Sequence, residues 1–418
     1  MESTGKKEFD FPFFFIDKKV IILYNVNIKK SKKEVRKMKL RSYIFEDPTK
    51  EELFNAIVEK YNLNKNEKKE IYYGLIEGLD VSIYANSNKY NWKQMKSLRL
   101  GLENGLNINL YSNPEYNWSQ MKEIMLGLIS KVDVSIYSYV KFDAKQMKQI
   151  RIGLERNIDV SIYAKPDFTW EQMAIIREGL EKRLNVSLYA KPEFRPSQME
   201  QIRRGLEDKI DVSIYANSEF NFYQMSQIRY GLEEDLDVTV YAKPEFNKDQ
   251  MEQIRFGLLQ KLDVSLYAKP EFNWMQMYQI KSGLNGNLNV SVYAKPELNA
   301  PEMREIRWAL KNKLNESDIL KYAKPIYTAP QMNDLFRGLK QNLDVSWYAN
   351  PEFGPYQMEE IRLGLQKNLD VSLYAKLEFN GAQMSQIRLG LEQGIDVSPY
   401  LNPSIDWLEM EKIRKRIK

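Results

Sequence analysis

The 418-residue chain contains neither cysteine nor histidine. Their absence excludes Cys–His and Ser–His nucleophilic catalysis, zinc sites built from His or Cys, and the usual ligation of haem and iron–sulfur clusters. Sites made only of carboxylates, and chemistry based on lysine or on a pair of acids, stay open. A carboxylate-dependent enzyme is therefore the one catalytic alternative. A chain without cysteine is compatible with the cytoplasmic location that we expect.

Long apolar runs are also absent, since none approaches the roughly 18 residues of a membrane-spanning helix. The apolar run that ends at Ile16 is followed by Asp17-Lys18-Lys19 and is not typical of a signal peptide. There is no Walker A loop and no Gly-rich dinucleotide motif. We therefore expect no membrane contact, no cofactor, no metal, no small-molecule substrate and no enzymatic activity.

What the chain does contain is a 26-residue unit that recurs thirteen times from about residue 85. One methionine marks each copy, and positions are numbered below from it, so that position +5 lies five residues after it. One interval is 29 residues, between Met303 and Met332. Fixed periods of this size are typical of solenoids. The marker residues are Met95, Met121, Met147, Met173, Met199, Met225, Met251, Met277, Met303, Met332, Met358, Met384 and Met410.

Each unit predicts a long helix followed by a short one. Asn, Asp or Thr stands at position −4 in eleven copies, and Gln or Glu always stands at −1, which is the pattern of a capping box. Apolar residues at 0, +3, +7 and +11 predict one buried stripe, for example Met251, Ile254, Leu258 and Leu262. Asp or Asn at +12 can then cap a second helix of one to two turns containing Val-Ser-x-Tyr-Ala. A strand over these residues is the alternative.

These patterns predict a mainly α protein, an α-solenoid of about thirteen long-helix/short-helix repeats over residues 65–418. Residues 1–64 are expected to form an N-terminal cap that contains a β-hairpin and a basic segment. Residues 1–41 carry twelve Lys or Arg against five acidic residues, whereas the rest of the chain is close to neutral. The candidate phosphate-binding residues are Lys29, Lys30, Lys32, Lys33, Arg36, Lys37, Lys39 and Arg41.

Two positions in the long helix hold the same residue type in most copies: glycine at +6, called the glycine row below, and arginine at +4, called the arginine row. We expect the glycines to allow close approach of the neighbouring repeat's helix, and a change to alanine to be mild. The arginines could track a phosphate backbone, but we favour a structural ladder in which each one bonds the Asp or Asn at +12 or the carbonyls at a helix end. The ladder includes Arg151, Arg203, Arg255, Asp159, Asp211 and Asp263.

Position +5 varies between copies and is often apolar, which favours a surface for a partner. Packing between repeats is an alternative that the sequence leaves open. The candidate partner-binding residues are Ile152, Arg204, Tyr230, Phe256 and Trp308.

The motif Gln-Met-x-x-Ile-Arg-x-Gly-Leu, followed by Leu-Asp-Val-Ser-x-Tyr-Ala-Lys-Pro-Glu-Phe, resembles the tandem helical repeats of uncharacterised proteins from Firmicutes and their phages and mobile elements. The resemblance covers about four fifths of the chain. It implies a phage or mobile-element setting, including interference with host defences. The sequence as a whole predicts a non-enzymatic scaffold that binds another protein through the solenoid surface. A nucleic-acid-binding protein that uses the basic segment and the arginine row is the alternative.

Overall fold

The computed structural model describes residues 45–417, so the expected β-hairpin and the basic cluster at residues 29–41 lie outside the described part. Among the described residues all regular secondary structure is helical, which confirms a mainly α solenoid of repeated helices. Contacts divide the chain into two compact units, Met1–Glu155 and Arg156–Lys418. The expected boundary between residues 64 and 65 falls inside the first unit, between two helices that pack together.

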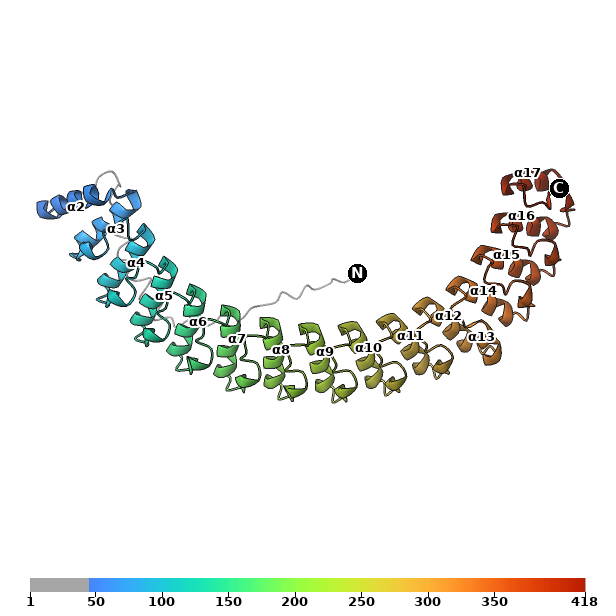
Figure 1. Cartoon of the computed structure of the whole chain (residues 1–418), viewed down its shortest axis with the longest axis horizontal. Helices are drawn as coiled ribbons and strands as arrows, with labels where there is room; N and C mark the ends of the chain where they lie inside the picture. Colours follow the sequence, from blue (N-terminus) through green and yellow to red (C-terminus); the bar gives the residue numbers. More distant parts are fainter. Residues whose placement is uncertain (1–44, 418) are drawn as a thin grey trace, which may run out of the picture. The chain divides into compact units, whose positions relative to one another are not determined.

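The helices follow one another in chain order within each unit (Figure 1). Those of the first unit are α2 Pro48–Tyr61, α3 Lys65–Ile76, α4 Trp92–Glu103, α5 Trp118–Ile129 and α6 Ala144–Glu155. Those of the second are α7 Trp170–Glu181, α8 Pro196–Glu207, α9 Phe222–Glu233, α10 Lys248–Leu259, α11 Trp274–Asn285, α12 Ala300–Lys311, α13 Glu316–Tyr322, α14 Ala329–Lys340, α15 Pro355–Gln366, α16 Gly381–Glu392 and α17 Trp407–Ile417.

The short element of each repeat is a single turn of 3-10 helix, at the lower end of the one to two turns expected. These turns are η1 Val81–Ile83, η2 Ile108–Leu110, η3 Val134–Ile136, η4 Val160–Ile162, η5 Val186–Leu188, η6 Val212–Ile214, η7 Val238–Val240, η8 Val264–Leu266, η9 Val290–Val292, η10 Val345–Trp347, η11 Val371–Leu373 and η12 Ser398–Tyr400. In the repeat that holds three extra residues, α13 replaces the turn. No described residue forms the alternative strand.

The capping residues fix where each helix begins and ends. In α10 the side chain of Asn247 accepts hydrogen bonds from the backbone N–H groups of Asp249 and Gln250, both at 3.0 Å, and Gln250 accepts one from Asn247 N–H at 2.8 Å. The helix ends at Leu259, and Lys261, two residues later, has a φ of 56° that lets Leu262 N–H reach the carbonyl of Gly257 at 3.0 Å. This reversal brings the following 3-10 turn back against its own long helix.

The core of each repeat lies between the long helix and the 3-10 turn. In the repeat of Met251, the side chains of Met251, Ile254 and Tyr267 are fully buried. Leu258 and Leu262 were expected in the core, but they are only half-buried. The reason is that Val264 and Tyr267 pack against position +6, so the core centres on positions 0, +3 and +6 and leaves the C-terminal part of the stripe at its edge.

The glycine row serves a contact inside each repeat, not the neighbouring helix that we expected. A Cβ added to Gly257 would lie 1.9 Å from the hydroxyl oxygen of Tyr267 and 2.8 Å from Cγ1 of Val264, both in the turn of the same repeat. The Tyr267 hydroxyl donates to the carbonyl of Gln253 at 3.2 Å, on the turn of α10 next to Gly257. Among the copies that are followed by a short element in the described part, the exception is Ala309, and it fits this geometry because Ile319, not tyrosine, stands ten residues later.

Candidate binding surface

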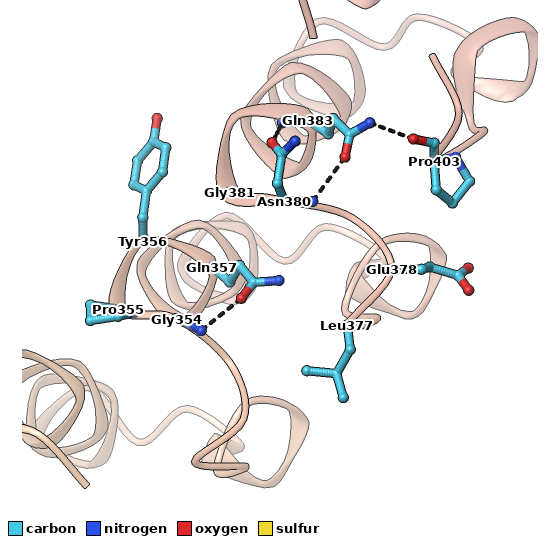
Figure 2. Close-up of a pocket in the computed structure, with 10 residues that line it drawn as sticks. All are labelled: Gly354, Pro355, Tyr356, Gln357, Leu377, Glu378, Asn380, Gly381, Gln383 and Pro403. Atoms are coloured by element: carbon cyan, nitrogen blue, oxygen red, sulfur yellow. Dashed lines mark hydrogen bonds between the residues drawn. The ribbon is translucent and has the colours of Figure 1, made fainter. Parts of the chain in front are cut away.

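Glutamine at position −1 joins the start of each long helix to the loop that leads into the next one. Gln383 shows both halves of this role: its Oε1 accepts from Asn380 N–H at 2.8 Å, and its Nε2 donates to the carbonyl of Pro403 at 2.8 Å (Figure 2). The same Nε2 also donates to the carbonyl of Ile405 at 2.7 Å. Gln250 makes the equivalent bonds to Pro270 and Phe272. The hollow that Figure 2 shows between the starts of α15 and α16 is lined in part by groups that these caps already use, and also by Tyr356, Leu377 and Glu378.

Sequence reasoning assigned the residue at −1 only to the capping box and missed the hydrogen bonds that its side-chain amide donates to the next loop. A signal was present, because the two copies with glutamate at −1 are Glu302, which precedes the longer loop, and Glu409 in the last helix. Glutamate could accept the capping bond but could not donate to the two carbonyls.

The arginine row lies between successive long helices and is used inside the solenoid. Arg388 pairs through Nε with Glu360 of the preceding helix at 2.6 Å and through Nη1 with Glu392 of its own helix at 2.8 Å. Arg151 is held in the same way by Glu123 and Glu155. A guanidinium held by carboxylates on both sides has few donors left for phosphate, so the geometry favours structural use of the row.

The partners of these arginines differ from those that we expected. Arg255 bonds Gln227 at 3.1 Å and Glu234 at 2.7 Å, both on the preceding helix, and Arg203 bonds Glu200 and Glu207 of its own helix. The Asp residues at +12 turn instead to their own 3-10 turn. Asp159, Asp211 and Asp263 each accept from the backbone N–H of the serine two residues later, at 3.0, 3.0 and 3.1 Å. A short aspartate side chain satisfies the nearest free N–H and does not reach the arginine.

Three of the thirteen copies do not hold arginine at +4, and of their residues Met125, Lys281 and Phe336 only Lys281 is a cation. Lys281 takes the place of arginine in α11, and Oε1 of Gln253 in the preceding helix is buried without a hydrogen-bond partner among the described residues. In α10 and α12 the arginine Nε donates to the glutamine at the same position, at 3.1 and 3.0 Å. Lysine carries no group at that point of its side chain.

We therefore expect Lys281→Arg to satisfy Gln253 and to raise the free energy of unfolding by about 1 kcal/mol. Urea denaturation followed by circular dichroism measures this. Lys269→Arg, on an exposed loop, is the matched control and should change stability by less than about 0.5 kcal/mol. Equal effects of the two changes would contradict the assignment.

On α9 to α12, exposed or half-exposed aromatic side chains and Met275 stand at positions −2, +1 and +5. These positions lie within about 60° of one another on a helix, so they form one face. Tyr223 is 58% exposed, Met275 49%, Tyr278 46% and Tyr230 40%. We call the aromatic surface the set Tyr223, Tyr230, Phe256, Met275, Tyr278 and Trp308, all on α9 to α12 of the second unit.

Cations link the rings of this surface from one helix to the next. The Arg255 guanidinium lies 4.6 Å from the ring of Phe256 and 5.7 Å from that of Tyr230 on the preceding helix. The ammonium of Lys281 lies 5.1 Å from the ring of Phe256. Rings and cations therefore alternate along the surface, and each contact fixes the orientation of a half-exposed ring.

The structure brings only some of the sequence-predicted residues into this surface. Tyr230, Phe256 and Trp308 belong to it. Ile152 is half-buried on α6 in the first unit, and Arg204 is exposed on α8 and paired with Glu200 at 2.9 Å. Sequence reasoning missed Tyr223, Met275 and Tyr278, because it followed position +5 alone. The helical angle shared by −2, +1 and +5 would have found them.

Other kinds of site find no support in the described residues. Over residues 45–417, no group of three or more acidic residues is placed to hold a metal ion. No helix described there has both the length and the apolar character to cross a membrane. Comparisons of the chain with protein-family models, with curated proteins and with solved structures gave no match.

Proposed function

We propose that this chain is a non-enzymatic scaffold that binds another protein through the aromatic surface of α9 to α12. The observation that carries the proposal is the exposure of Tyr223 and Tyr230 on α9 and of Met275 and Tyr278 on α11, at positions that share one helical face. Aromatic residues that are exposed together and held in place by their neighbours are the usual anchors of protein interfaces. A phage or mobile-element setting, with host defence as the context, is part of the proposal and rests on the repeat motif alone.

The arginine row supports protein over nucleic acid as the ligand. A protein that tracks a phosphate backbone presents its cations to solvent and relies on their charge. Here Arg229, Arg255 and Arg362 are less than a tenth exposed, and each is paired with a carboxylate. The aromatic surface also carries Asp249 and Glu252 of α10, which would repel phosphates.

We expect Tyr230→Ala, Phe256→Ala and Trp308→Ala each to weaken partner binding by more than about 1 kcal/mol, because each removes a buried anchor of the interface. The partner is first isolated with the tagged full chain from nuclease-treated lysate at two salt concentrations, and its affinity for each variant is then measured by calorimetry. Leu266→Ala is the matched control. It truncates an apolar side chain of similar exposure on η8, outside the aromatic surface, and should change affinity by less than about 0.5 kcal/mol.

The salt dependence separates the two kinds of ligand. For a protein partner, replacing Lys29, Lys30, Lys32 and Lys33 with alanine should matter little. If the ligand is nucleic acid, affinity falls steeply with salt, and the same replacement lowers the slope by about one unit for each lost phosphate contact. That outcome, or an affinity that survives all three aromatic truncations, contradicts the proposal.

A further inference from the structure

The cations at position +4 are neutralised by carboxylates from a small set of positions. Most of these are +8 of the same helix and +2 or +9 of the preceding repeat, and Arg203 also uses Glu200 at +1 of its own helix. Arg229 uses Glu233 at +8, Arg255 uses Glu234 at +9 of α9, and Arg362 uses Asp334 at +2 of α14. These carboxylates matter because burying most of a charged group away from water costs free energy unless an opposite charge lies beside it.

The cations of two consecutive helices within the aromatic surface lack these carboxylates. Among the described residues, neither Lys281 of α11 nor Arg307 of α12 forms an ion pair, and Arg307 Nε donates only to the amide of Gln279, at 3.0 Å. Helix α11 contains no acidic residue. The positions that carry carboxylates in other repeats hold Gln253, Gln260, Gln279, Asn285, Gly286 and Lys311 here.

Lys281 is both partly desolvated and close to exposed rings. It is 9% exposed, and burial lowers its pKa, while the charge of Glu252, too distant for an ion pair, acts in the opposite direction. Its ammonium lies 5.1 Å from the ring of Phe256 and 5.7 Å from that of Tyr278. Beyond Arg307, the ammonium of Lys340 lies 5.3 Å from the ring of Trp308. Unneutralised cations and aromatic anchors therefore occupy one stretch of the surface.

We infer that the α11–α12 part of the aromatic surface binds an acidic polypeptide segment, whose carboxylates take the place of those missing beside Lys281 and Arg307 and whose apolar side chains lie against Tyr278 and Trp308. The inference rests on the proposed function and names the chemistry of the partner. A carboxylate side chain matches what the same cations bind in the other repeats. The rings favour a polypeptide over a continuous phosphate backbone, because Tyr278 and Trp308 lie beside Lys281 and Lys340 and can contact apolar side chains. Asp249 and Glu252 of α10 border the same stretch and repel either kind of anion.

The test selects binding peptides from a phage-displayed library of random dodecapeptides, with the full chain as bait. Enriched peptides are synthesised, and their affinities are measured by fluorescence anisotropy. We expect them to be rich in Asp and Glu and to contain at least one aromatic or large aliphatic residue. A fluorescent single-stranded oligothymidine and a 20-base-pair duplex are measured beside them as nucleic-acid probes.

The decisive variant is Gln279→Glu/Asn285→Glu, which installs the carboxylates that hold Arg388 in its own repeat, at +2 of the preceding helix and +8 of the same helix. It keeps both cations and adds two internal ion pairs, so the fold is preserved. The affinity for the acidic peptides should fall at least tenfold. The control Gln386→Glu/Gln393→Glu adds the same charges beside Arg414, which contacts both glutamines outside the aromatic surface, and should change affinity less than twofold.

Each other outcome overturns a defined part of the argument. Enriched peptides that are neutral or basic, yet lose binding with Tyr278→Ala and Trp308→Ala, contradict the acidic partner and leave protein binding in place. Equal loss in the decisive variant and its control likewise shows that the local carboxylates are irrelevant. A selection that yields no peptide, peptides that ignore both kinds of variant, or tighter binding of the nucleic-acid probes contradicts the proposed function together with the inference.

Discussion

Gly257→Ala should destabilise the protein by about 1–3 kcal/mol, although alanine is the better helix former. The added Cβ would lie 1.9 Å from the Tyr267 hydroxyl, on a side chain that is fully buried and held by its bond to the Gln253 carbonyl. The tyrosine must move, and the repeat then loses both the packing and the hydrogen bond. Helix propensity alone predicts the opposite sign, a gain of about 1 kcal/mol. Urea denaturation followed by far-UV circular dichroism decides between the two.

A double-mutant cycle makes the cause specific. The chain itself contains an alternative solution in Ala309, which has Ile319 and not tyrosine ten residues later. In a Tyr267→Ile background, Gly257→Ala should therefore cost at least about 1 kcal/mol less than it does in the wild type, because the clashing hydroxyl is gone. If the cost is the same in both backgrounds, the tyrosine does not determine the glycine.

Gln250→Glu should lower the free energy of unfolding by about 2–4 kcal/mol. The carboxylate can still accept from Asn247 N–H, but it cannot donate to the carbonyls of Pro270 and Phe272, which Gln250 reaches at 3.1 and 2.7 Å. Two hydrogen bonds are lost at about 1 kcal/mol each, and the buried carbonyl of Phe272 is left facing a negative charge. The same denaturation measurement tests this.

The matched control is Gln279→Glu, which makes the same chemical change where the side chain accepts from Arg307 Nε. A carboxylate strengthens that bond, so this variant should be neutral or stabilising. Opposite signs for the two glutamine-to-glutamate changes are the expected result. A Gln250→Glu variant as stable as the wild type would show that the bonds to the loop do not contribute to folding.

The repeat, the long helix and its boundaries could be read from the sequence because they depend on local contacts. The capping box at Asn247 and Gln250 involves residues three apart, and the stop at Leu259 follows from the reversal beside it. The burial of Met251 and Ile254 follows from helical periodicity. The structural use of the arginine row could also be inferred, since most units carry acidic residues on the same helix.

The sequence did not show which side chains contact one another between the long helix and the 3-10 turn or between neighbouring repeats. The same tyrosine that occludes Gly257 lies ten residues away, and the carboxylates that hold an arginine lie on the preceding helix about 28 residues back. Whether residues so far apart in the sequence touch depends on how the 3-10 turn folds onto the long helix and on the register between neighbouring repeats. The sequence by itself determined the unit and its helices through short-range hydrogen bonding and periodicity. The tertiary structure decided which rows of side chains form contacts within the solenoid and which stay exposed to bind a partner. The reason is that burial and ion pairing arise only when the repeats stack.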